Sequence, residues 1–105
     1  MLRIEARISE NNDWTPVFIS DSSICQENEA YIIQQIGTEL KKFAFPHSKI
    51  GSRLSPSDFA REVIKNDALA VARKIVWESG NNNSFQTDGW IADTLVSIRA
   101  FLERR

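Results

Sequence analysis

The chain has 105 residues, of which 42% are hydrophobic and 26% charged, and its formal net charge is −1. This apolar content, together with so small a net charge, excludes a wholly disordered chain. The length suits one domain spanning residues 1–105, in which roughly 60–70% of the unfolded surface can be buried.

The first twenty residues predict an antiparallel β-hairpin. Apolar residues alternate with polar ones from Leu2 to Ile8, which is typical of a half-buried strand. A turn-type cluster follows at residues 9–13, and residues 14–20 form a second apolar and β-branched stretch. Pro16 should lie near an edge or at the start of its strand, because proline cannot donate to a ladder.

A first helix is expected after the turn residues 21–23. It should begin at Cys25 or Gln26 and end near Phe43, since Pro46 follows closely and the residue before proline avoids the helical region. Gly37 inside this helix predicts a close packing contact. The apolar stripe expected to face the core consists of Ile33, Ile36, Leu40 and Phe43.

Ser55 and Pro56 mark the start of a second helix, as the N-cap and the first helical residue. This helix either runs unbroken to Ser79 or breaks at Asn66-Asp67. Residues 85–87 form either a third short strand or an extended linker. Asp88 then caps a last helix, whose expected stripe is Ile91, Leu95, Ile98 and either Phe101 or Leu102.

These elements predict an α+β fold in the order ββααα. The N-terminal hairpin, with or without a third short strand, packs against three helices on one face of a small antiparallel sheet. The free edges of such a sheet can receive another chain.

Cys25 is the only cysteine, so no internal disulfide can form, and we expect a reducing compartment, most simply the cytoplasm. The first residues lack the apolar core of a signal peptide. No apolar run approaches the roughly 20 residues that span a bilayer, so we expect no membrane partner.

The charges are strongly segregated along the chain. Between Arg7 and Lys41 the sequence contains no Lys and no Arg. Carboxylates near an aromatic side chain suit a surface that binds a basic protein. The candidate partner-binding residues are therefore Glu10, Asp13, Trp14, Asp21, Glu27 and Glu29. If the first helix folds back on the hairpin, these positions should converge. The alternative interpretation is a solubilising acidic surface with Trp14 packed into the core.

The middle of the chain is basic, from Lys41 to Lys74, and could meet nucleic-acid phosphates. A solvated basic face that balances the acidic third is the alternative interpretation, and we favour it over nucleic-acid binding. The candidate nucleic-acid contacts are Lys41, Lys42, Lys49, Arg53, Arg61 and Lys65.

No catalytic motif is present. His47 is the only histidine, and no spacing pairs it with a nucleophile, so we interpret it as a surface loop residue. For Cys25 we weigh a reactive thiol near a helix start against a buried structural residue, and favour the second. We expect no metal site and no cofactor, since one His and one Cys cannot build a structural zinc site.

The sequence therefore predicts a small non-catalytic protein-binding module. Its most concrete form is an inhibitor, such as an immunity protein that neutralises a basic nuclease toxin by occupying the positions of substrate phosphates. One alternative is a nucleic-acid-associated regulator that uses residues 41–74. Another is an assembly subunit that pairs through its hairpin edge.

Overall fold

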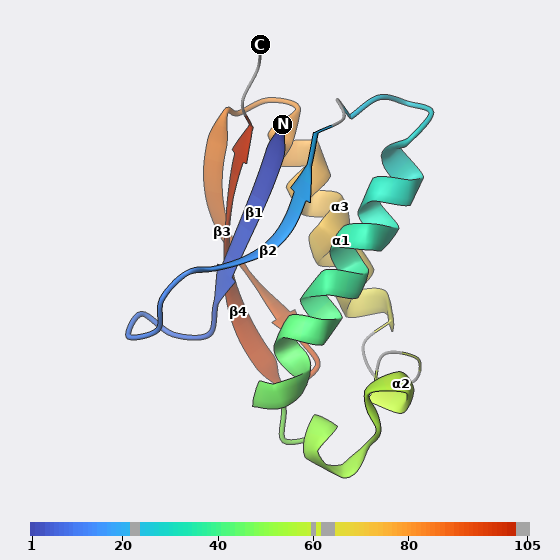
Figure 1. Cartoon of the computed structure of the whole chain (residues 1–105), viewed down its shortest axis with the longest axis vertical. Helices are drawn as coiled ribbons and strands as arrows, with labels where there is room; N and C mark the ends of the chain where they lie inside the picture. The colour runs from blue at the N-terminus through green and yellow to red at the C-terminus, as the bar shows by residue number, and fades with distance from the viewer. Residues whose placement is uncertain (22–23, 60, 62–64, 103–105) are drawn as a thin grey trace.

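The computed structural model describes residues 1–21, 24–59, 61 and 65–102 (Figure 1). A four-stranded antiparallel sheet carries the longer helices on one of its faces. The elements are β1 (Leu2–Arg7), β2 (Thr15–Ser20), α1 (Glu29–Ala44), the 3-10 turns η1 (Phe45–His47) and η2 (Gly51–Arg53), α2 (Pro56–Asp58), α3 (Lys65–Ser79), β3 (Ser84–Ile91) and β4 (Thr94–Leu102).

The α+β class is confirmed, but the predicted order ββααα is wrong, because strands occupy both ends of the chain. The strand order is β2-β1-β4-β3, so the first and last strands form the centre of the sheet. Each residue from Leu2 to Arg7 faces a partner on β4 between Ser97 and Leu102. The fold is therefore closed by pairing between residues almost a chain length apart.

The predicted hairpin is confirmed as β1 and β2, joined by residues 8–14. Leu2, Ile4 and Ala6 are buried against the helices, as the alternation predicts. β2 is an edge strand, which explains how Pro16 is accommodated. A bulge at Val17 shifts the register between Ile4 and Glu5.

The predicted last helix is wrong: residues 84–102 form the β3–β4 hairpin. The expected stripe of Ile91, Leu95 and Ile98 matches a helical period, but the same segment also alternates with period two. From Thr94 onward every second side chain is buried, while Leu95 is exposed on the opposite face. Asp88 is no cap but faces Ser97 across the ladder. Residues 85–87, left open between strand and linker, belong to β3.

α1 begins later than predicted, at Glu29 rather than Cys25 or Gln26. A turn at 26–28 precedes it, in which the Cys25 amide donates to Asn28 Oδ1 at 2.8 Å. Ser22 and Ser23 of the expected turn lie outside the described residues. Gly37 is buried against α3, but a Cβ there would lie 3.4 Å from Leu69 Cδ2, which is an ordinary van der Waals distance, so the packing does not require glycine at this position. The buried residues of α1 are Ile32, Ile36, Gly37, Leu40 and Ala44, with Ile33 and Phe43 half-buried beside them.

The cap predicted at Ser55 is confirmed: its Oγ accepts from the Asp58 amide at 3.1 Å. The helix that it starts is α2, and Phe59 and Arg61 beyond it have π-helical backbone. The next helix, α3, begins at Lys65, and residues 60 and 62–64 between them lie outside the described residues. α3 continues through Asn66-Asp67, so no break occurs there. None of the helices in the described ranges is long and apolar enough to cross a bilayer.

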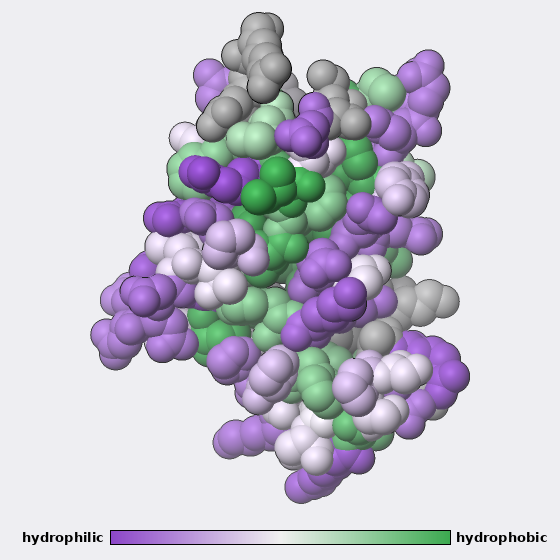
Figure 2. All heavy atoms as spheres, in the orientation of Figure 1, coloured by the Kyte–Doolittle hydropathy of each residue, from purple (hydrophilic) through white to green (hydrophobic). Residues whose placement is uncertain are grey.

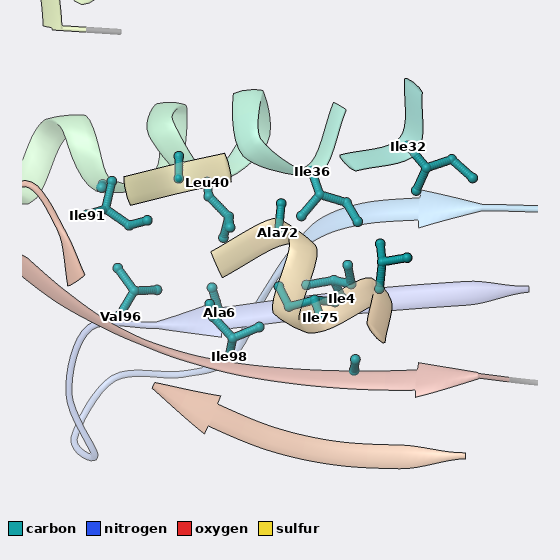
Figure 3. Packing of buried hydrophobic residues seen from close by; sticks show 14 of the residues in the cluster. Ile4, Ala6, Ile32, Ile36, Leu40, Ala72, Ile75, Ile91, Val96 and Ile98 are labelled. Atoms are coloured by element: carbon teal, nitrogen blue, oxygen red, sulfur yellow. The ribbon is translucent and has the colours of Figure 1, made fainter. Parts of the chain in front are cut away.

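The core lies between the sheet and the pair α1 and α3 (Figure 3). Ile36 and Leu40 project from α1 toward the sheet, Ala72 and Ile75 belong to α3, and Ile4 and Ile98 come from the central strands. α3 approaches β3 so closely that a Cβ on Gly89 would lie 2.6 Å from Val71 Cγ2. The opposite face of the sheet carries no helix in the part of the chain that is described.

Candidate protein-binding surface

The cation-free part of the sequence folds into consecutive elements around β2. Among its described residues, 8–21 and 24–40, it comprises the β1–β2 loop, β2, the connection after it and most of α1. We call this surface the acidic flank. Six carboxylates lie on it, and all are exposed or half-buried: Glu10, Asp13, Asp21, Glu27, Glu29 and Glu39.

The expected convergence of these carboxylates is wrong. Glu10 and Asp13 lie on the β1–β2 loop, whereas Asp21, Glu27 and Glu29 lie beyond the other end of β2 (Figure 1). A strand rises about 3.3 Å per residue, so the two groups stand roughly 20 Å apart along β2. That distance exceeds the Debye length of about 8 Å at physiological ionic strength, so they act as two separate centres of negative charge.

A groove runs between β2 and α1 and joins these two ends. Its hollow holds about 460 Å³. Figure 2 shows apolar atoms over the upper part of β2 beside hydrophilic side chains over α1. We call it the strand–helix groove, and its lining contains no Lys and no Arg: Val17, Phe18, Ile19, Tyr31, Gln34, Gln35, Thr38 and Glu39.

Two large apolar side chains of this groove face solvent. Ile19 is 57% exposed and Tyr31 is 66% exposed. The Tyr31 hydroxyl accepts a hydrogen bond from Gln35 Nε2 at 2.7 Å, so the ring is held along the helix surface. Exposed aromatic side chains such as that of Tyr31 are enriched at protein interfaces.

A second hollow, of about 390 Å³, continues the same seam toward the β1–β2 loop. Arg7, Asp13 and Thr15 border it on the strand side, and Phe43 of α1 and His47 of η1 border it on the helical side, so Asp13 has a cation beside it at this end. The seam between β2 and the helical layer is therefore hollowed along the length of the strand.

Trp14 lies on the open face of the sheet rather than in the groove. The guanidinium carbon of Arg7 lies 4.4 Å from the centre of its ring, and that of Arg99 lies 4.5 Å from it. Arg99 also pairs with Glu5, with Nε and Oε1 2.6 Å apart. Trp14 therefore anchors the end of the β1–β2 loop to the sheet through cation–π contacts.

Sequence reasoning missed the arginine and aromatic cluster on this open face. Arg3 lies 4.9 Å from the ring centre of Phe101, which also carries Arg99 at 5.4 Å. The Nε atoms of Arg3 and Arg7 are buried with no hydrogen-bond partner. The alternation of charged residues along β1 places these arginines on one face. Phe101, the aromatic partner of Arg3, comes from β4, which was predicted as a helix, and Trp14, the partner of Arg7, was interpreted as a partner-binding residue.

The predicted nucleic-acid contacts gather at one end of the molecule, where α1 ends and η1, η2 and α2 follow (Figure 1). Lys41 and Lys42 share a small hollow with Phe59. The side chain of Lys65 lies outside the described part of the chain. The exposed cations of this basic end are Lys42, Lys49, Arg53 and Arg61, of which Arg61 pairs with Asp58 at 2.6 Å.

Asp93 joins the β3–β4 turn to the η1–η2 segment. Its carboxylate accepts from Ser48 Oγ and from the amides of Lys49 at 2.9 Å and Ile50 at 3.3 Å. The Ser48 hydroxyl bond and these amides hold the pKa of Asp93 below its ordinary value near 3.8. The ionised carboxylate is therefore a structural acceptor.

The described residues form no group of His, Cys, Asp and Glu that could hold a metal ion. Cys25, favoured above as a buried residue, is exposed, and its Sγ lies 3.1 Å from Glu27 Oε2. His47 is exposed in η1, its ring centre 5.8 Å from that of Phe43. The thiol of Cys25 therefore donates to a carboxylate, but both residues are exposed, and no hydrogen bond described here joins His47 to a nucleophile.

A scan of protein-family models, a search of curated proteins and a search of solved structures found no match to the chain.

Proposed function

We propose that the protein is a non-catalytic binding module that captures a basic partner protein on its acidic flank. The observation that carries the proposal is the groove between β2 and α1, which is lined only by residues of the cation-free window and holds no Lys and no Arg in its lining. Opposite charge on the partner would speed encounter, and exposed apolar side chains of the groove would slow dissociation. The most concrete form is an inhibitor of the immunity type, whose carboxylates replace the phosphates bound by a basic nuclease toxin.

The test uses two double variants of the protein as baits, each of which has lost two negative charges. Asp21→Asn/Glu29→Gln removes two carboxylates from the acidic flank, and Glu78→Gln/Asp88→Asn removes two from elsewhere. Proteins captured from a lysate are identified by mass spectrometry, purified and titrated at low and high salt. We expect a basic partner whose association weakens about tenfold or more in the flank variant and with salt, but not in the control variant. Equal binding by both variants, or binding that ignores salt, would contradict the proposal.

One observation favours a second candidate, a nucleic-acid-associated regulator. The exposed cations Lys42, Lys49 and Arg53 lie at the same end of the molecule, beside the end of α1. Phosphate contacts weaken steeply with salt. A gel shift at modest salt that disappears in Lys42→Ala/Arg53→Ala would favour this candidate over the first, and the absence of any shift would remove it.

A further inference from the structure

We infer that the partner docks as an extended basic segment that adds a fifth strand to the outer edge of β2, with its side chains in the strand–helix groove. This inference rests on the proposed function and specifies how the partner is bound. Four observations carry it: the free edge, the groove beside it, the charge at both ends, and the arrangement of Pro16 and the bulge.

β2 is an edge strand that pairs with β1 alone in the described sheet. Edge strands commonly carry Lys, Pro or a bulge, which discourage pairing with another chain. In β2 these devices are confined to the first half, at Pro16 and Val17. Phe18 and Ile19 keep a regular register with β1 and carry no charge, so a new strand can pair along this part of the edge.

The groove supplies the side-chain contacts that an added strand needs. A strand laid on the edge of β2 would place alternate side chains against α1, where Tyr31, Gln35 and Thr38 line the hollow. Backbone hydrogen bonds to the edge would give affinity, and the groove would select side chains. Phe18, which lies on the helix face opposite Ile4, and Tyr31 provide the apolar contacts, and Glu39 provides an acidic one.

The charge pattern identifies an extended and basic occupant. Carboxylates stand at the two ends of β2, roughly 20 Å apart, which about six residues of extended chain can span. A compact cation would meet only one of these ends. A second copy of this chain is disfavoured as the occupant, because pairing two β2 edges would bring together two flanks without a Lys or Arg between residues 8 and 40.

The experiment begins with a phage-displayed library of short random peptides selected on the immobilised full chain. The dominant peptide is synthesised, and its affinity, its chemical-shift footprint and the hydrogen exchange of the protein amides are measured. We expect a peptide rich in Lys or Arg that alternates with apolar residues. Amides of β2 should gain protection, while those of β3, the other edge strand, should not.

Two matched variants test the groove. Tyr31→Ala truncates an exposed aromatic side chain of α1 inside the groove, and Trp90→Ala truncates one on β3, the opposite edge strand, that is 59% exposed and outside the groove. Because both side chains are largely exposed, we expect both variants to fold. Tyr31→Ala should weaken binding of the peptide about fivefold or more, and Trp90→Ala should leave the affinity unchanged.

The outcomes separate this inference from the proposed function. Suppose that Asp21→Asn/Glu29→Gln weakens binding of the peptide, that Tyr31→Ala does not, and that the β2 amides gain no protection from hydrogen exchange. The acidic flank then binds its partner, but strand addition is wrong. If Tyr31→Ala lowers the affinity for the peptide but neither salt nor Asp21→Asn/Glu29→Gln changes it, the groove binds a strand, but the proposal of a basic partner is wrong. A selection that enriches no peptide, or a peptide that maps elsewhere, overturns the inference. A dimer in light scattering that excludes the peptide would make a second copy the occupant instead.

Discussion

Gly89 is the point at which the close approach of α3 to the sheet can be tested. It lies on the helix-facing side of β3, opposite Val96, and its backbone has no positive φ. Alanine is therefore allowed by the backbone and resisted only by packing. Its Cβ would lie 2.6 Å from Cγ2 and 3.3 Å from Cγ1 of Val71. Both methyl groups belong to a β-branched side chain with restricted χ1, so they cannot rotate away freely.

Gly89→Ala should lower the free energy of unfolding by about 1–2 kcal/mol. Overpacking a core contact costs about 1–3 kcal/mol. The loss of unfolded-state freedom on replacing glycine returns about 0.4–1 kcal/mol. For a domain of this size the net change corresponds to a fall in Tm of roughly 4–16 °C. Thermal and urea denaturation, followed by circular dichroism, measure it.

Two comparisons make the assay specific. In a Val71→Ala background both γ-methyl groups are gone, so Gly89→Ala should cost nothing or stabilise the protein, giving a coupling of about 1 kcal/mol or more. At Gly80, which has no positive φ, the only near atom is the Trp77 carbonyl oxygen at 3.4 Å, so Gly80→Ala should not destabilise. A Gly89→Ala protein as stable as the parent, or an equal cost in both backgrounds, would refute the packing argument.

Three further outcomes are expected. Asp93→Asn should lower Tm at neutral pH, because a carboxylate with a lowered pKa stabilises the fold while it is ionised. The difference in Tm from the parent should vanish as the pH falls through the pKa of Asp93, and thermal melts at a series of pH values measure it. Trp14→Leu should cost about 1–2 kcal/mol through two lost cation–π contacts, and an unchanged urea midpoint would count against them. Phe59 is 1% exposed and its ring makes an edge contact with that of Phe45, so Phe59→Ala should lower the free energy of unfolding by about 3–5 kcal/mol in urea denaturation. A decrease below about 1 kcal/mol would mean that this end of the core is not tightly packed.

The composition of the binding surface could be predicted from the sequence, but its arrangement could not. The absence of cations between Arg7 and Lys41 is a property of the sequence. The length of β2 separates Asp13 from Asp21, and the seating of α1 beside β2 creates the groove that joins them. Tyr31 and Ile19 gained their importance only from this seating, since an isolated exposed apolar residue carries no signal.

Local patterns in the sequence determined the β1–β2 hairpin, the body of α1 and the cap at Ser55, because alternation, helical period and cap chemistry act over a few neighbouring residues. The last hairpin was decided by tertiary structure. The segment after Asp88 satisfies both a helical and a strand period, and the difference between them comes from pairing with β1. That pairing joins residues at the two ends of the chain, so no local window of the sequence contains the interaction that makes β4 a strand.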